Sequence, residues 1–74
     1  MGIRSGSRVA WSYQGATTYG KVIGIAGTRA TITTPNGQVT RVGNDADPVI
    51  RLRSESTGRM VLKRRSELRE APKK

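Results

Sequence analysis

The sequence predicts an all-β protein in which short strands close into one small barrel. Short segments alternate between apolar and polar residues, and turn-forming Gly, Pro and Asn recur about every eight to twelve residues. No stretch shows a sustained helical period. A chain of 74 residues has room for one small core and buries only about 60% of its unfolded surface. We therefore expect a single domain over residues 1–74, with its core at about 6–69 and flexible ends.

Two strands are expected at the N-terminal end of the chain. Residues 8–13 alternate in polarity, which places Val9, Trp11 and Tyr13 on one face of a half-buried strand. A short turn containing glycine leads to a second strand at residues 17–25. Two glycines inside this second strand suit the bends or bulges of a small barrel.

The clearest local pattern is a β-hairpin in the middle of the chain. Residues 28–33 and 38–42 are rich in β-branched side chains, and Thr34-Pro35-Asn36-Gly37 joins them. An Asn-Gly pair readily supplies the positive φ angles of a tight hairpin turn.

The C-terminal part predicts two further strands and a short helical turn. Pro48 follows a polar loop and suits the entry to a strand at residues 49–53, with Ile50 and Leu52 facing inward. A second strand is expected at 59–63, with Met60 and Leu62 on the core side, and one helical turn at 66–70. Together these elements predict a small SH3-like barrel of about five strands with a short C-terminal helical turn.

Four short motifs occur in an order and spacing that resemble a known family. They are Val9-Ala10-Trp11, Gly20-Lys21-Val22, Asp47-Pro48 and Ser66-Glu67-Leu68. Together they resemble the hypervirulence-associated Tudor-like domains of bacteria and fungi, over roughly Gly6 to Arg69. The resemblance implies a Tudor or SH3-like barrel. Relatives often carry an aromatic residue shortly after the Asp-Pro pair, where this chain has Ile50, which weakens the inference of an aromatic pocket there.

The composition argues against an enzyme and against a metal or cofactor site. The chain has neither Cys nor His, so it lacks thiolate and imidazole groups for catalysis or zinc binding. Asp45 and Asp47 with one Asn fall short of the six to eight oxygen ligands that calcium prefers, and turn hydrogen bonds are the favoured role. No apolar run suits a signal peptide or a membrane span, so we expect a cytoplasmic protein with no membrane partner.

The strong positive charge points to anionic partners. Fourteen Lys and Arg residues face five Asp and Glu residues, which gives a formal net charge of +9. We expect paired strands to gather cations on one surface that binds DNA or RNA phosphates weakly and in a salt-sensitive way. The alternative reading is a solvated face that keeps the protein soluble. The candidate nucleic-acid-binding residues are Arg51, Arg53, Lys63, Arg64 and Arg65.

A protein-interaction or self-associating module is the alternative function. It would present a sheet edge, or the region of Trp11 and Tyr19, to an acidic protein partner or to a second copy of the chain. A cage for methylated lysine or arginine needs several aromatic rings, and only Trp11, Tyr13 and Tyr19 are available. Because Trp11 and Tyr13 share the face of Val9, at least one of them is expected in the core. The favoured role of Trp11 is that of a core or barrel-rim anchor.

Overall fold

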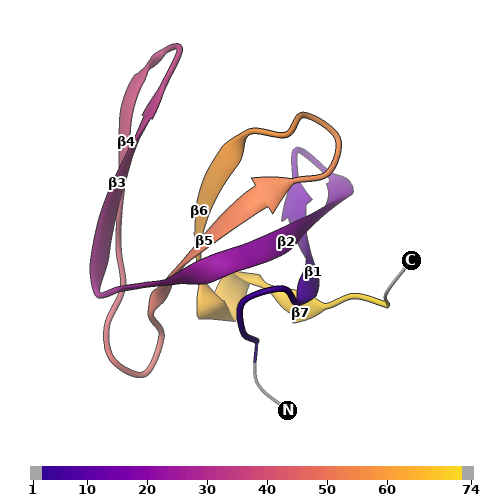
Figure 1. Cartoon of the computed structure of the whole chain (residues 1–74), viewed down its shortest axis with the longest axis horizontal. Coiled ribbons are helices and arrows are strands. Elements are labelled where there is room, and N and C mark those ends of the chain that lie inside the picture. Colours follow the sequence, from indigo (N-terminus) through magenta and orange to yellow (C-terminus); the bar gives the residue numbers. More distant parts are fainter. Residues whose placement is uncertain (1–2, 73–74) are drawn as a thin grey trace.

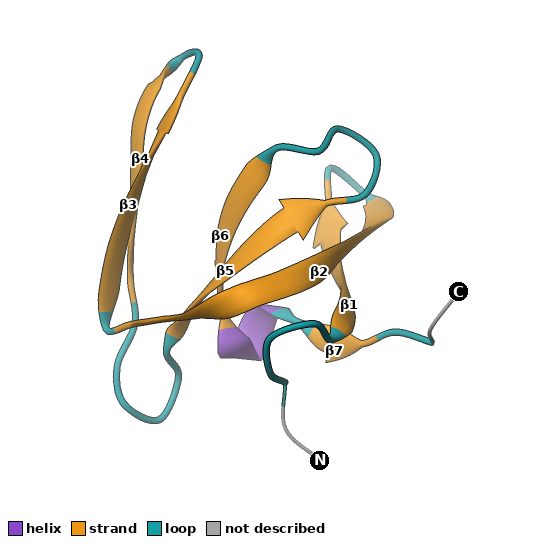
Figure 2. Cartoon of the chain, viewed as in Figure 1, coloured by secondary structure: helices purple, strands orange, loops and turns teal. Residues whose placement is uncertain are grey.

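The computed structural model describes residues 3–72, which form β-strands and one 3-10 turn (Figures 1 and 2). The flexible ends expected from the sequence fall partly on residues 1–2 and 73–74, which lie outside the described residues. The predicted all-β class is confirmed. In chain order, the elements are β1 (Arg8–Tyr13), β2 (Ala16–Gly27), β3 (Arg29–Thr34), β4 (Gly37–Val42), β5 (Val49–Ser54), β6 (Met60–Arg64), η1 (Arg65–Glu67) and β7 (Arg69–Glu70).

The strands form two sheets and not the expected single five-stranded barrel. Five strands pair in the antiparallel order β6-β5-β2-β1-β7, and β3 pairs with β4 alone. The larger sheet curves strongly, but its hydrogen bonds do not close, so β6 and β7 remain edge strands (Figure 1). The β3–β4 hairpin leaves the larger sheet after Gly27. This glycine makes the last pairing of β2 with β5, and its φ of +98° turns the chain away from the sheet. Such a φ favours glycine because it lacks a Cβ atom.

The β3–β4 hairpin confirms the pattern read from the sequence, with one difference in the turn. Thr34 pairs with Gly37, so Pro35 and Asn36 form the two-residue loop. Gly37 has a φ of +124°, whereas Asn36 does not adopt a positive φ. The Asn-Gly pair therefore supplies one positive φ, because the loop begins one residue earlier than an Asn-Gly turn would require.

The C-terminal helical turn is shorter and earlier than expected. It covers Arg65–Glu67 as a 3-10 turn instead of residues 66–70. Leu68 is extended and buried, and the following β7 pairs with Val9 and Ala10 of β1. Burial of Leu68 and pairing with β1 stabilise the extended chain over a longer helix.

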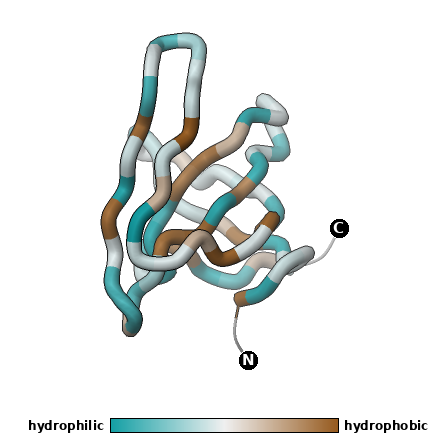
Figure 3. Tube along the Cα trace, turned by 60° about the vertical axis from the view of Figure 1, so that its left-hand side comes forward, coloured by the Kyte–Doolittle hydropathy of each residue, from teal (hydrophilic) through white to brown (hydrophobic). Residues whose placement is uncertain are grey.

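The main hydrophobic cluster fills the concave face of the curved sheet. Strand pairing places Val9 and Trp11 opposite Gly20 and Thr18 on the inner face, as predicted, but β1 is not half-buried throughout, because Ala10 is also buried and Tyr13 is 58% exposed. Hydrophobic segments gather in the body of the molecule, whereas the tip of the β3–β4 hairpin is pale to hydrophilic (Figure 3). The buried members of this inner cluster are Ile3, Val9, Trp11, Val22, Ile50, Leu52 and Leu68.

A second cluster lies on the opposite, outer face of β5 and β6. Val49 and Leu62 pack there with Ala30 of the hairpin, and Ala26 and Ile32 add partly buried contacts. Leu62 and Met60 thus lie on the outer face and not on the side of Ile50 and Leu52, because they stand opposite Arg51 and Arg53. Val49 and its neighbour Ile50 both have no exposed surface. Consecutive strand residues point to opposite faces, so β5 is covered on both sides at this point. The hairpin therefore packs against the outer face of the larger sheet.

The polar loop before β5 is fastened to the 3-10 turn. The Asp47 carboxylate accepts hydrogen bonds from the backbone N–H and the hydroxyl of Ser66, both at 2.7 Å. The N–H of Arg65 donates to the carbonyl of Pro48 at 2.9 Å. The hydrogen bonds from Ser66 lower the pKa of Asp47. The Asp47-Pro48 and Ser66-Glu67-Leu68 motifs thus form one contact.

Glu67 connects the 3-10 turn to the hairpin. Its carboxylate accepts the backbone N–H of Arg64 at 2.8 Å and pairs with the guanidinium of Arg41 on β4. Burial raises the pKa of Glu67, but the hydrogen bonds from Arg64 and Arg41 outweigh it and lower the pKa overall. This ion pair holds β4 near the C-terminal end of β6.

Candidate binding surfaces

The strand register determines which predicted basic residues share a face. Directly opposed residues of an antiparallel pair lie on the same side of the sheet. Lys21 stands opposite Arg53, and Arg51 lies two residues along the same strand. On the other side of β5, Arg64 stands opposite Val49, which belongs to the same outer face. We call Lys21, Arg51, Arg53 and Arg64 the outer basic strip.

Two of the predicted basic residues do not join this strip. Lys63 stands opposite Ile50 and therefore lies on the inner side of the sheet. Arg65 begins the 3-10 turn beyond β6. Lys21 was not among the basic residues predicted from the sequence. Its position opposite Arg53 depends on the pairing of β2 with β5, which no local sequence pattern reveals.

Most of the strip's charge is available for a partner. The ion pairs within residues 3–72 involve Arg8, Arg41 and Arg64, and the Arg64 contact with Glu67 is long, at 3.7 Å. Arg53 donates one N–H to the carbonyl of Gly58 at 2.9 Å, which leaves its other donors for a ligand. The outer strip is thus a set of cations with little internal neutralisation.

Tyr19, a predicted partner-binding residue, takes part in an internal contact. The guanidinium of Arg8 lies 4.3 Å from the centroid of the Tyr19 ring. The same guanidinium makes two hydrogen bonds with Glu55, at 2.7 and 3.0 Å, and one with the carbonyl of Pro72 at 2.7 Å. Tyr19 therefore helps to order the contact between β1, the β5–β6 turn and the C-terminal segment.

Trp11 and Tyr19 do not form the common surface that the sequence suggested. Trp11 is only 3% exposed and belongs to the inner cluster, as its expected anchoring role requires. Tyr19 stands opposite Ala10, on the outer side of the β1–β2 pair. Because neighbouring residues of a strand face opposite sides, the two rings lie on different faces.

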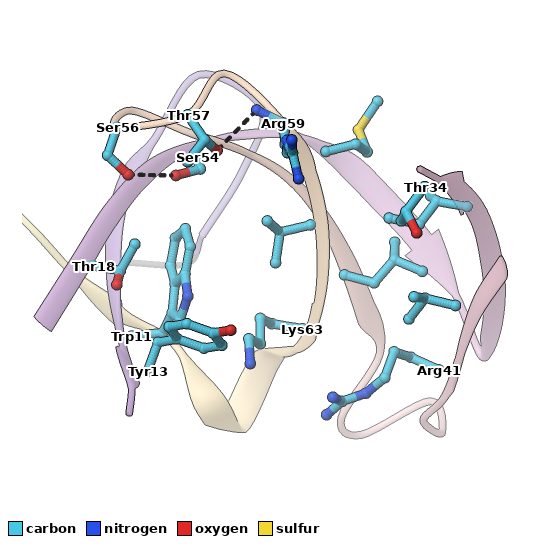
Figure 4. A pocket seen from close by; sticks show the side chains of 15 residues that line it. Trp11, Tyr13, Thr18, Thr34, Arg41, Ser54, Ser56, Thr57, Arg59 and Lys63 are labelled. Atoms are coloured by element: carbon cyan, nitrogen blue, oxygen red, sulfur yellow. Dashed lines mark hydrogen bonds between the residues drawn. The ribbon is translucent and has the colours of Figure 1, made fainter. Parts of the chain in front are cut away.

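A groove of about 420 Å³ lies along β6. The inner face of β1 and β2 bounds it on one side, and the β3–β4 hairpin bounds it on the other. Trp11, Tyr13 and Thr18 lie on one side and Thr34 and Arg41 on the other, with Arg59 and Lys63 between them (Figure 4). We call this cavity the β6 groove. Its lining residues are Trp11, Tyr13, Thr18, Ile32, Thr34, Val39, Arg41, Ser54, Ser56, Thr57, Arg59, Met60, Val61, Leu62 and Lys63.

The lining of the β6 groove does not suit a methylated cation. Trp11 and Tyr13 are its aromatic residues, and Tyr13 is 58% exposed. Three lining residues are cationic, whereas the described lining contains no carboxylate. A cage for a methylated amine needs several ring faces and no competing positive charge. This groove favours an anionic ligand.

The described part of the chain shows no cluster suited to a metal ion. No three side chains among His, Cys, Asp and Glu come together within residues 3–72. Over the same residues, no helix is long and apolar enough to cross a membrane.

Comparison with known families agrees with the fold and the motifs. The family model described as the hypervirulence associated proteins TUDOR domain matches residues 6–68. The chain belongs to this family. The resemblance inferred from the sequence motifs is therefore confirmed. No curated protein and no solved structure gave a match to the chain.

The family motifs have structural contacts in this Tudor domain. Trp11 packs against the backbone of Gly20, and Asp47 holds Ser66. These residues maintain the fold, so the motifs themselves do not identify a ligand. Membership in the Tudor family indicates a small binding module.

Proposed function

We propose that residues 1–74 form one small, non-enzymatic binding domain that engages the phosphate backbone of DNA or RNA through the outer basic strip. The main support for this proposal is the strand register, which puts four cations on one face of β2, β5 and β6. They are Lys21, Arg51, Arg53 and Arg64. Neighbouring strands lie about 4.8 Å apart, and residues two apart on a strand about 6.6 Å. The strip can therefore contact several phosphates at once, with Arg64 on the far side of the Val49–Leu62 contact that the hairpin covers.

The chemistry of the strip supports contact with phosphates and not with bases. Three of its four members are arginines, whose planar guanidinium groups suit bidentate hydrogen bonds to phosphate oxygens. The strip itself contains no aromatic residue that could stack on a base. Phosphate contacts position a protein on nucleic acid but carry no sequence information. We expect weak, sequence-independent binding.

The test is fluorescence-polarisation binding to duplex DNA, single-stranded DNA and RNA across a salt series. If all four strip cations contact phosphates, log K should fall with log salt with a slope of about −3 to −4 on duplex DNA. A variant with Arg51→Gln and Arg53→Gln should bind more weakly, with a slope shallower by about 2. Equal affinity at all salt concentrations, or no binding, would refute the proposal.

The matched control is a variant with Arg4→Gln and Arg29→Gln. Both arginines are exposed and lie outside the strip, so the net charge falls by the same amount. The proposal requires this control to bind more tightly than the strip variant. Identical losses in the two variants would assign the binding to net charge alone.

A further inference from the structure

We propose that the β6 groove binds an extended acidic peptide, which adds a strand to the free edge of β6. This proposal does not depend on nucleic-acid binding, because none of the four strip residues lines the groove. Three features of the groove support it: its course along the strand, the backbone groups at that edge and the charge of its lining.

The groove follows the edge of β6 and not one of its faces. Five consecutive residues, Arg59 to Lys63, line it. Side chains of consecutive strand residues point to alternate faces, so a cavity on one face would contact only every second residue. Trp11 on the inner side and Ile32 on the hairpin bound the same cavity. A ligand in it would lie beside the β6 backbone.

The hydrogen-bond pattern identifies the backbone groups that face the groove. The N–H of Ser54 on β5 donates to the carbonyl of Arg59 at 3.0 Å, so the main-chain groups of Arg59 point towards β5. Because the main-chain groups of successive strand residues point to alternate edges, the N–H and C=O groups of Met60 and Leu62 point away from β5. The N–H of Arg64, next in this series, points away from β5 to Glu67 at 2.8 Å, as the alternation requires.

Met60 and Leu62 thus offer backbone groups to a further strand. Within residues 3–72, β6 pairs with β5 alone, and no backbone partner lies at the other edge for these two residues. An unpaired edge beside a cavity is the geometry used when an extended peptide joins a sheet. Main-chain hydrogen bonds would provide affinity, and the flanking pockets would select side chains.

The lining selects an acidic peptide with apolar residues at alternate positions. Arg59 and Lys63 contribute positive charge, while Arg41 already pairs with Glu67. Tyr13 and Val39 offer exposed apolar surface on the two sides of the groove. A second copy of β6 would bring further Arg and Lys residues against these cations, so an acidic partner segment fits better than self-pairing.

The test uses a capped peptide of alternating valine and glutamate, about six residues long to match the span of β6. Trp11 is the single tryptophan and lines the groove, so its fluorescence should change on titration. Hydrogen exchange followed by NMR should show slower exchange of the Met60 and Leu62 amides. Backbone N-methylation of the peptide should abolish binding, because it removes the donors that a new strand needs.

Charge variants separate this site from the outer basic strip. Arg59→Gln with Lys63→Gln should weaken peptide binding by about tenfold. The matched control, Lys21→Gln with Arg53→Gln, removes the same charge from the strip and should leave peptide affinity unchanged. The strip control should instead lose affinity for oligonucleotides, so failure of one proposal is distinguishable from failure of the other.

Several results would overturn the proposal. They are the absence of peptide binding, equal binding of the N-methylated peptide or of one with lysine in place of glutamate, and binding without protection of Met60 and Leu62. Protection of these amides by oligonucleotide instead of peptide would assign the groove to nucleic acid. Concentration-dependent dimerisation with the same protection would assign it to a second copy of the chain.

Discussion

Gly20 lies where β2 comes very close to the backbone of β5 and to the Trp11 ring of β1. A Cβ atom at this position would lie 2.5 Å from the carbonyl oxygen of Arg53 and 2.8 Å from the Trp11 ring. The first neighbour is backbone and the second is a buried aromatic ring, so neither can move away at low cost. The glycine of the Gly20-Lys21-Val22 motif is therefore required by packing.

We expect Gly20→Ala to lower the free energy of unfolding by about 1–3 kcal/mol, the usual cost of overpacking a core. Chemical denaturation followed by Trp11 fluorescence measures this change. Gly24→Ala is the matched control, since beyond the residue itself and its two chain neighbours no atom lies within 4 Å of the added Cβ. Similar stabilities of the two variants would contradict the packing argument.

Individual residues differ in how far the sequence predicts their roles. The burial of Trp11 followed from simple alternation with Val9. The stacking of Arg8 on Tyr19 did not, because Glu55, which fixes that guanidinium, lies 47 residues further along the chain. Local patterns report the face of a strand, whereas such contacts depend on the packing of distant segments.

At the scale of elements, hairpins were easier to predict than the pairing of distant strands. Turn residues identified the β3–β4 hairpin from its own sequence. The separation of Lys63 from Arg51 and Arg53 depends on the register between β5 and β6. A shift of one residue would exchange the faces, so charge alone could not decide which cations gather.

The contact between Asp47 and Ser66 should make stability depend on pH. The folded state lowers the pKa of Asp47, so this carboxylate stabilises the fold fully above its unfolded value of about 3.9. The contribution is lost as the pH falls through the lowered folded value. We expect the wild-type protein to lose stability in this acidic range, as measured by urea denaturation at a series of pH values.

Asp47→Asn removes this titration while keeping the size of the side chain. The variant should be less stable at neutral pH and should show a smaller loss of stability on acidification. Asp45→Asn is the control, because Asp45 belongs to the same loop and makes neither hydrogen bond to Ser66. An unchanged pH profile in Asp47→Asn would exclude the proposed linkage.

At the scale of the whole molecule, the excess of positive charge should oppose folding at low ionic strength. The Debye length is about 30 Å at 10 mM salt and about 8 Å at 150 mM. The molecule measures 31 × 28 × 22 Å, so at low salt each cation interacts with charges across the entire structure. Compaction of a chain with a net charge of +9 is then unfavourable.

We expect the melting temperature to rise as salt increases from about 10 to 150 mM, because screening weakens this repulsion. A gain of about 0.5 kcal/mol would correspond to roughly 2–4 °C for a chain of this size. Calorimetry across the salt series measures the effect. The variant with Lys21→Gln and Arg53→Gln should show a smaller rise, and a fall with salt would mean that ion pairs such as those within residues 3–72 dominate instead.

The sequence predicted the class of the whole molecule correctly, but the predicted closed barrel was wrong. The net charge, the all-β class and the family resemblance all followed from composition and short motifs. The open edge of β6 and the separate hairpin depend on where Gly27 ends the β2–β5 pairing. The groove along β6 follows from that arrangement, and no single segment encodes it.

The double coverage of β5 links the two halves of the structure in a way that bears on cooperativity. Val49 and Ile50 each complete a different hydrophobic cluster, so displacing this strand dismantles both at once. The hairpin and the curved sheet should therefore melt in one transition and not as separate units. A peptide bound in the β6 groove would contact both the hairpin and the curved sheet, and would therefore stiffen the molecule as a whole.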